Sequence, residues 1–377
     1  MQKKFKYLDK SLLIVTVLLF LVGLVMVFSS SNVTAYMSHA VSPYNYFIKQ
    51  SIFLVVGLFL SLVMIKMTTK AYGMISWFLL LVTGASLFIL LIIGKAKNSA
   101  ISWFDLGFVS VQPSEFIKVI IIIWMSYYYD IKKKKLNSYS TILFPVGIAM
   151  LIAGLIFLQP DLGTTIIFSC IVFVLFWAAP INKIIKSKIV FGGIGLILFA
   201  SLLLVGSGKS LILSRQLERF NFTRPCDRLL DTGSQVCNGY IAINNGGLTG
   251  VGLGNSTQKY LYLPEPYTDF IYAVIVEELG AVSGVTIILA YMFVLYRILV
   301  VGSKSNSNFG RMMCYGVSVY IFLHITVNLM GILGLMPMTG VPLPFMSYGG
   351  SFTICLIAAL TIVQRVSIEN GLKNEKK

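Results

Sequence analysis

Residues 263–272, Leu-Pro-Glu-Pro-Tyr-Thr-Asp-Phe-Ile-Tyr, carry the chain from a polar, glycine-rich loop into a long apolar stretch. Pro264 and Pro266 restrict the approach to that stretch. Thr268 is placed to cap a helix, which leaves Asp269 in the first turn. A carboxylate at the mouth of a membrane bundle is costly unless it is solvated or paired, so Asp269 predicts a functional site. The alternative is simple compensation of the helix dipole.

The composition indicates an integral membrane protein. The 377 residues have a mean hydropathy of +0.85, 57% are hydrophobic and only 12% are charged. A net charge of +16 would suggest nucleic-acid binding in a soluble protein. Here the basic residues lie in short clusters between apolar runs, where they act as topology signals and attract anionic headgroups. The expected partner is therefore the membrane and not nucleic acid.

Ten apolar runs are long enough, or nearly so, to cross a hydrocarbon core of about 30 Å, which needs roughly 20 residues. The sequence thus predicts an all-α, polytopic membrane protein with ten transmembrane helices in one domain, residues 1–377. The runs near 114 and 351 are short, so they are expected to tilt or to extend through polar ends. The runs begin near residues 11, 47, 72, 114, 142, 163, 188, 269, 312 and 351.

The distribution of lysine and arginine predicts the orientation. With both termini in the cytoplasm, most of the 30 basic residues fall in short inner segments, as the positive-inside rule requires. The same orientation places a large extracellular loop, residues 208–268, between helices 7 and 8, and a short cytoplasmic tail at 366–377. The unusual polar motifs then gather at the outer face. A transporter would more naturally place its ionisable groups near the midplane.

Two of these motifs open with Gln-Pro. In the first, Lys118 follows Glu115 by three residues and enters an apolar run, where an unpaired ammonium would be expensive, so the two side chains are expected to pair. The pair is either functional or a purely structural ion pair. Asp161, in the second motif, fits ordinary turn chemistry equally well.

Several other polar groups have structural interpretations. The Pro-Leu-Pro stretch and Gly349-Gly350 predict irregular backbone that lines a cavity, with Ser347 and Tyr348 as lining residues and not catalysts. Glu277 and Glu278 are expected to pair with arginines of the outer loop. His324 is expected to be a packing residue with its polar atoms satisfied and not a ligand, and with only two histidines and no Cys/His cluster a zinc site is not predicted.

Cys226 and Cys237 both lie in the predicted outer loop, which is an oxidising setting. They are a candidate disulfide, and closing a loop of that length contributes roughly 3 kcal/mol in the chain-entropy model. Two free thiols are the alternative. Cys170, Cys314 and Cys355 lie in apolar runs and are expected to pack as small hydrophobes.

The motifs and their order resemble those of the SEDS family (shape, elongation, division and sporulation), which includes the peptidoglycan polymerases FtsW and RodA. The stretch at residues 254–259, Gly-Asn-Ser-Thr-Gln-Lys, is more similar to the division branch, FtsW, than to RodA. The resemblance covers nearly the whole chain, through residues 23–31, 112–118, 159–164, 246–254, 263–272 and 339–351.

The resemblance implies a glycosyltransferase that polymerises lipid II on the outer face of the bacterial cytoplasmic membrane during septal cell-wall synthesis. Asp269 matches the family's catalytic residue, and it is expected to take the proton of the attacking sugar hydroxyl. The implied partners are lipid II, the undecaprenyl-linked glycan chain, a class B penicillin-binding protein and other divisome proteins. Residues expected to bind substrate or to line the cavity are Glu115, Lys118, Asp161, Arg215, Arg219, Lys259, Glu265, Ser347 and Tyr348.

No cofactor is implied with certainty. The leaving pyrophosphate needs positive charge, which Lys118, loop arginines or a divalent cation could supply. The chain also departs from the family pattern: Tyr267 stands where histidine is usual, Ile101 and Ser102 replace a basic pair, and Phe352 replaces a serine. Three alternatives remain open: a RodA-type elongation polymerase, a lipid II flippase, and a non-enzymatic divisome scaffold. A flippase needs a polar path to the cytoplasmic side, and the inner helix halves offer almost no ionisable residues.

Overall fold

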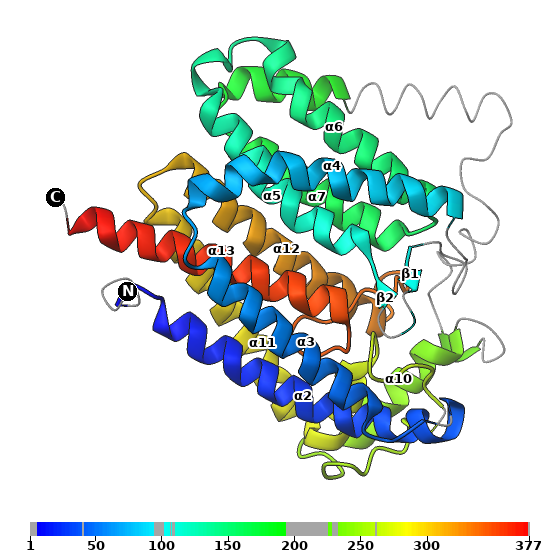
Figure 1. The fold of residues 1–377 in the computed structure, drawn as a ribbon. Helices are drawn as coiled ribbons and strands as arrows, with labels where there is room; N and C mark the ends of the chain where they lie inside the picture. Colours follow the sequence, from blue (N-terminus) through cyan, green and yellow to red (C-terminus); the bar gives the residue numbers. More distant parts are fainter. Residues whose placement is uncertain are drawn as a thin grey trace, which may run out of the picture.

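The structure is a computed structural model that describes residues 6–39, 41–93, 102–105, 107, 110–193, 225–227, 233–260 and 262–375. It is a bundle of long helices (Figure 1). The described β-structure is one short hairpin, in which Phe104–Asp105 (β1) pairs antiparallel with Ser110–Val111 (β2). The α-helices are α2 Lys10–His39, α3 Asn45–Met64, α4 Thr69–Ile93, α5 Pro113–Ile131, α6 Tyr139–Leu158, α7 Leu162–Ala178, α10 Gly233–Gly246, α11 Ile271–Ser303, α12 Asn308–Ile332 and α13 Gly350–Asn374.

Seven of the described helices are long and apolar enough to cross a membrane: α2, α3, α4, α6, α11, α12 and α13. The predicted spans near 114 and 163 are the shorter helices α5 and α7. In the predicted span near 188, residues 183–193 are helical, and the later residues of that prediction lie outside the described residues. The predicted outer loop is not free of secondary structure, because it contains a 3-10 turn at Pro225–Asp227 and the helix α10.

Helix α5 lies in the interior of the bundle, against α4, α7, α12 and α13. Most of its side chains are buried, and it carries the charges of Glu115, Lys118 and Asp130. The outer helices α2, α3 and α4 instead expose rows of large apolar side chains. Polar groups at membrane depth are thus surrounded by protein, while the outward surface suits lipid.

Both termini lie at the same end of the bundle, opposite the hairpin and α10 (Figure 1). Asp9 and Gln364 exchange hydrogen bonds of 2.9 and 3.0 Å, and the Ser367 hydroxyl donates to the Tyr7 carbonyl at 2.9 Å. Arg297 forms an ion pair with Asp9 at 2.6 Å. Helix α13 continues through most of the predicted tail at 366–377, as far as Asn374.

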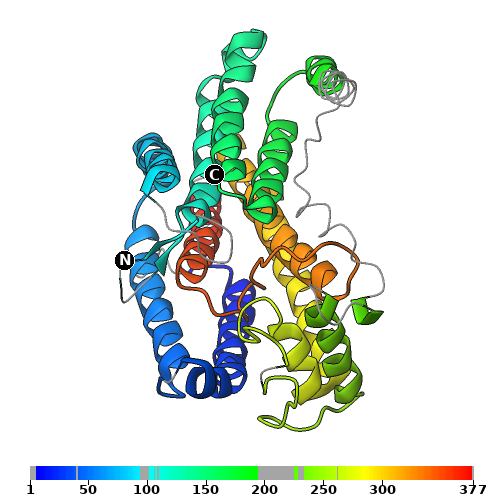
Figure 2. The same cartoon turned by 90° about the vertical axis from the view of Figure 1, so that its right-hand side faces the viewer.

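Helix α11 is interrupted near its beginning. Gly280 has a φ of +82° inside the helix, so the backbone leaves helical geometry there. The freed groups are satisfied by residues 247–252: the amides of Val251 and Gly252 donate to the carbonyls of Glu277 and Glu278 at 3.0 Å. In return, the Ala281 amide donates to the Gly247 carbonyl at 2.9 Å. The segment that follows α10 is therefore hydrogen-bonded into the break in α11, and α10 packs beside it (Figure 2).

This contact requires glycine at position 280. A Cβ built there lies 2.2 Å from the carbonyl oxygen of Leu248, and the positive φ disfavours any other residue. We expect Gly280→Ala to lower the free energy of unfolding by about 3 kcal/mol or more, because strain and a backbone clash add. Thermal unfolding in detergent measures this. Gly84→Ala in α4 is the control, since no atom lies within 4 Å of its Cβ position; equal melting temperatures for the two variants would contradict the prediction.

Candidate functional site

Three helix N-termini meet at the end of the bundle away from the chain termini. Gln112, just before α5, joins them: its backbone amide donates to the Ser351 hydroxyl of α13 at 3.0 Å, and its side-chain amide donates to Asp161 at 3.3 Å. Asp161 is the N-cap of α7, where its other oxygen accepts from the Thr164 amide at 3.0 Å. Asp161 therefore has the predicted role in the turn before α7. Through its bond with Gln112, the same carboxylate also links the start of α5 to the start of α7.

The predicted pair of Glu115 and Lys118 forms, with Nζ and Oε1 2.8 Å apart and both side chains buried. Lys118 also donates to His324 Nε2 at 3.0 Å. A lysine ammonium has only donors, so Nε2 must be the acceptor and the imidazole carries its proton on Nδ1, which faces the Pro342 carbonyl at 3.4 Å. His324 is thus a buried residue whose polar atoms have partners, as predicted, and these contacts continue a polar chain from α5 to the segment before α13.

The surroundings of His324 explain why the sequence alone did not reveal this role. Its ring lies between Tyr320, at 4.8 Å, and Phe352, at 4.6 Å between centroids. These neighbours resemble ordinary core packing. The only signal in the chain is a lone imidazole in an apolar helix, and its partner Lys118 is more than two hundred residues away along the chain. Phe352, which departs from the family pattern, supplies the stacking face.

Asp269 lies two residues before α11 and not in its first turn, because the helix begins at Ile271 with Phe270 as the N-cap. The predicted capping by Thr268 is wrong: its hydroxyl is 3.0 Å from Asp269 Oδ1 and 2.8 Å from the Glu265 carbonyl. Burial raises the pKa of the Asp269 carboxyl from its usual 3.8 to about 6, and the hydrogen bond from Thr268 opposes part of that rise.

The backbone around Asp269 is held by neighbouring segments. The side-chain amide of Asn328 donates to the Asp269 and Val341 carbonyls, each at 2.8 Å. The Ser347 hydroxyl donates to the Thr268 carbonyl and accepts from the Leu343 amide at 2.8 Å. Ser347 thus positions the loop by hydrogen bonds to backbone, a more specific role than the predicted lining of a cavity.

Helix α12 links Asp269 to the buried pair. His324 and Asn328 lie one helical turn apart on it and contact the neighbouring carbonyls of Pro342 and Val341. The adjacent Gly340 has a φ of +66°, and a Cβ built there would lie 4.0 Å from Asp269 Oδ2. The segment 339–343 therefore lies between Asp269 and the pair in α5. A displacement of Asp269 or of the Glu115–Lys118 pair should therefore be transmitted to the other through residues 339–343.

An aromatic cluster lies next to Asp269. Tyr267 packs against Tyr46, with centroids 4.3 Å apart, and against Tyr348 at 5.8 Å. The Tyr348 amide also donates to the Tyr267 carbonyl at 2.9 Å. Tyr348, which was predicted to line a cavity, thus contacts Tyr267 beside Asp269. Tyr46 was not predicted, because nothing in its local sequence marks it. Tyr267, which replaces the family's usual histidine, has a packing role here.

Lys259 does not lie free in a cavity. Its ammonium forms an ion pair with Glu278 at 2.9 Å, and the lysine is only 1% exposed. Glu278 also accepts from the Ser29 hydroxyl of α2, while Glu277 accepts from Thr257, both from its amide at 3.2 Å and from its hydroxyl at 2.9 Å. The arginines of the outer loop, which were predicted to pair with these two glutamates, lie outside the described residues. Lys259 instead fastens the loop to α2 and α11.

The remaining predicted residues are less central or lie elsewhere. Glu265 is exposed and has a φ of +48°. Cys226 and Cys237 form a disulfide with Cα atoms 4.9 Å apart, which is inside the range that a disulfide spans. Arg215 and Arg219 lie outside the described residues. Among the residues that the structure describes, no group of three or more His, Cys, Asp or Glu side chains is arranged to hold a metal ion.

Comparison with known proteins gives one consistent result. The family model of the FtsW, RodA and SpoVE cell cycle proteins matches residues 9–371. A protein of Bacillus subtilis (strain 168) named "Probable peptidoglycan glycosyltransferase FtsW" is 35% identical, over 100% of this chain and 94% of its own length. The like-named protein of Coxiella burnetii is 32% identical over 96% of both chains. Stage V sporulation protein E of Bacillus subtilis is 32% identical, covering 95% of this chain and 96% of its own.

Solved structures show the same fold at lower identity. One, described as the structural coordination of polymerization and crosslinking by a peptidoglycan synthase complex, has a TM-score of 0.75 at 23% identity. It covers 96% of this chain and 98% of the other. The rod shape determining protein RodA of Thermus thermophilus has a TM-score of 0.66 at 23% identity, with 96% of each chain covered.

The pair in α5 should be costly to break. We expect Lys118→Met to lower the free energy of unfolding by about 3–5 kcal/mol, because it leaves the Glu115 carboxylate buried without its counter-charge. The double variant Glu115→Gln/Lys118→Met should recover more than half of that loss. Thermal unfolding of the two single variants and the double variant measures the coupling. Lys134→Met, which removes an exposed lysine, should change stability by less than about 0.5 kcal/mol; strictly additive single effects would show that the pair is not coupled.

Proposed function

The chain belongs to the family of FtsW, RodA and SpoVE cell cycle proteins, and we propose that Asp269 is the general base of its glycosyl transfer. The protein is a peptidoglycan glycosyltransferase of the FtsW type. The observation that supports Asp269 is its position: a partly buried carboxylate, with a pKa raised to about 6, on backbone held by α12 and by residues 341–347. A base with a pKa near the working pH is well suited to take a proton in the transition state.

The proposed substrate is lipid II on the outer membrane surface. The 4-hydroxyl oxygen of one lipid II attacks the anomeric carbon of the growing chain, and its proton passes to Asp269. The bond from that carbon to the pyrophosphate oxygen breaks, and undecaprenyl diphosphate leaves with the electron pair. The rigid backbone around Asp269 supports this step because a base must be held in place before the reaction begins.

The buried pair takes a positioning role in this proposal. Lys118 is fully buried between Glu115 and His324, so it does not extend to a pyrophosphate as the sequence suggested. We assign it the task of holding α5, α12 and the Pro342 carbonyl in register. Positive charge for the leaving group must then come from elsewhere, either from arginines of the outer loop or from a divalent cation.

A lipid II flippase is less well supported. Its substrate would need a polar path from one end of the bundle to the other. Two described ion pairs lie at the end that carries the termini, and both are satisfied where they are. Arg297 with Asp9 joins α11 to the segment before α2, whereas Arg365 and Glu369 pair within α13. Asp269 precedes α11 on the side of α10 and the hairpin, which lie at the opposite end (Figure 1). This one-sided arrangement favours chemistry at one membrane surface.

A crosslinking partner is also proposed. The solved complex that this chain resembles coordinates polymerization with crosslinking, which supports a class B penicillin-binding protein as the partner. The FtsW-named relatives support work in the division machinery at the septum, with other divisome proteins nearby. In the proposed orientation both termini are cytoplasmic and Asp269 faces outward.

Asp269→Asn tests the base directly. We expect it to reduce polymerisation of labelled lipid II by about 10²- to 10⁴-fold, because the amide keeps the shape and loses proton acceptance. Melting temperature should stay within a few degrees of the parent value. Asp105→Asn is the matched control at the same end of the bundle, where the carboxylate is exposed and caps only a local turn. If the Asp269→Asn variant polymerised lipid II at the parent rate, Asp269 would not be the general base.

The pH dependence follows from the raised pKa. The base must be ionised, so the rate should rise roughly tenfold per pH unit below about 6 and level off above it. The nearby Glu265 charge contributes to the rise in pKa, so Glu265→Gln should move the profile to lower pH. The folded state binds the proton more tightly than the unfolded state, so this group's contribution to stability is lost as pH rises from about 4 to 6. A rate independent of pH across that range would contradict the role.

A further inference from the structure

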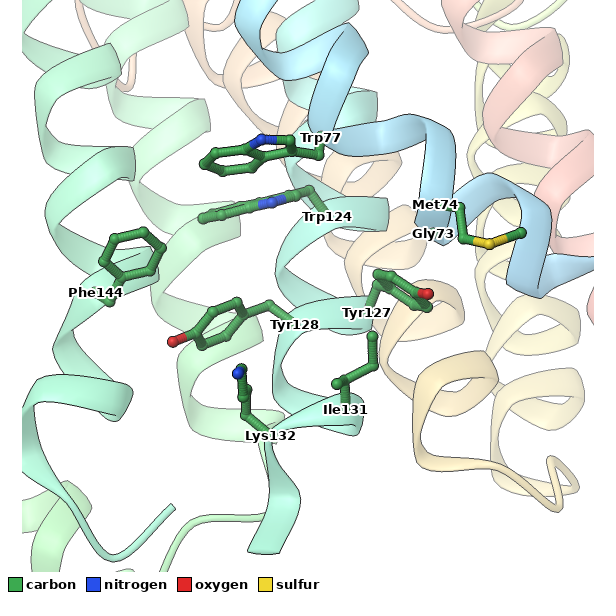
Figure 3. A pocket seen from close by; sticks show the side chains of 9 residues that line it. All are labelled: Gly73, Met74, Trp77, Trp124, Tyr127, Tyr128, Ile131, Lys132 and Phe144. Atoms are coloured by element: carbon green, nitrogen blue, oxygen red, sulfur yellow. The ribbon is translucent and has the colours of Figure 1, made fainter. Parts of the chain in front are cut away.

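A groove with a volume of about 290 Å³ lies between α4, α5 and α6, on the lateral surface of the bundle (Figure 3). It is far from the site described above along α5: Glu115 and Lys118 lie in the first two turns of that helix, and the groove is lined by residues of its last two turns. The α3–α4 turn beside it contacts the C-terminal part of α13, where Arg365 donates to the Ile65 carbonyl at 3.1 Å. The groove is therefore at the end of the bundle that carries the chain termini.

Aromatic rings from all three helices form its walls. Trp77 of α4 stacks on Trp124 of α5 with centroids 5.4 Å apart, and Trp124 continues to Tyr128 at 5.9 Å. Tyr128 in turn stacks on Phe144 of α6 at 5.6 Å. Figure 3 shows Trp77, Trp124 and Tyr128 one after another, with Phe144 to one side. Trp77 and Phe144 remain 42% and 48% exposed, so the row is open to whatever surrounds the bundle.

The groove ends in positive charge. Lys132 lines it directly, and the next residues, Lys133–Lys135, form an exposed 3-10 turn. Lys70 lies three and four residues before Gly73 and Met74, which also line the groove, so it shares their face of α4. Asp130 is the one acidic residue among the last residues of α5. The apolar, aromatic groove thus ends near five lysines, Lys70 and Lys132–Lys135.

We propose that this groove binds an anionic phospholipid of the membrane leaflet at that end, with an acyl chain along the aromatic row and the phosphate headgroup at the lysines. The alternative for a lysine run is a general topology signal, which needs no groove beside it. Here the lysines directly adjoin the apolar groove. This arrangement matches an anionic phospholipid, which has a charged headgroup next to apolar acyl chains. If a transmembrane helix occupied the groove, it would not require lysines at the end of the groove.

The tryptophans allow a direct test in vesicles. In the full chain carrying Trp103→Phe and Trp177→Phe, the remaining tryptophans both line the groove. The variant is reconstituted into equimolar phosphatidylglycerol and phosphatidylcholine, with brominated acyl chains on one lipid or on the other. We expect stronger quenching by brominated phosphatidylglycerol, equivalent to about fivefold local enrichment, the effect of roughly one lysine at an anionic surface.

Matched charge removal distinguishes the groove from general surface charge. Lys70→Gln/Lys132→Gln/Lys133→Gln should abolish the preference for phosphatidylglycerol. Lys183→Gln/Lys188→Gln/Lys373→Gln, which removes three exposed lysines elsewhere at the same end, should retain it. Equal quenching by the two lipids would overturn the proposal. So would loss of the preference in both triple variants, or quenching by neither lipid, which would show that protein fills the groove. Because the readout is fluorescence, it does not depend on polymerase activity.

Discussion

A lysine and a glutamate buried within an apolar bundle impose the strongest constraint on this structure. In lipid, neither Lys118 nor Glu115 could remain ionised at acceptable cost, so α5 must be enclosed by other helices. The enclosing helices α4, α7, α12 and α13 do this, and α12 adds the imidazole of His324 as a further partner. The central helix consequently carries a buried charged pair near its beginning, and the outer helices α2, α3 and α4 provide the apolar surface.

The same requirement shapes the irregular segments. Where α11 breaks at Gly280, the free backbone groups are taken up by residues 247–252. Where the chain between α12 and α13 cannot form a helix, Asn328, His324 and Ser347 satisfy its carbonyls and amides. Non-helical backbone at this depth is stable only because protein groups replace water as partners. The backbone around Asp269 is therefore positioned by the hydrogen bonds that its polar groups require as well as by packing.

The two ends of the molecule differ in chemistry. One gathers hydroxyls, amides and carboxylates around Asp269, with a buried pair behind it. The other fastens the terminal segments together through Asp9, Gln364 and Arg297, and carries most of the lysine clusters. Helix α5 joins the ends, with its charged pair toward Asp269 and its aromatic residues toward the lysines. A glycosyltransferase that takes a lipid-linked substrate at one surface and is oriented by anionic headgroups at the other would need this polarity.

The sequence by itself determined the class of protein, the positions of most helices, the pairing of Glu115 with Lys118 and the placement of Asp269 at a helix entrance. Each of these follows from local pattern: apolar runs of spanning length, two charges three residues apart, and a proline-bounded turn. Only the tertiary structure showed that Lys259 is buried against Glu278 and not free in a cavity, that His324 continues the charged pair, and that Tyr46 packs beside Tyr267. The physical reason is distance along the chain. A buried polar group takes whichever partner the fold brings near, and a hydropathy pattern does not specify that partner.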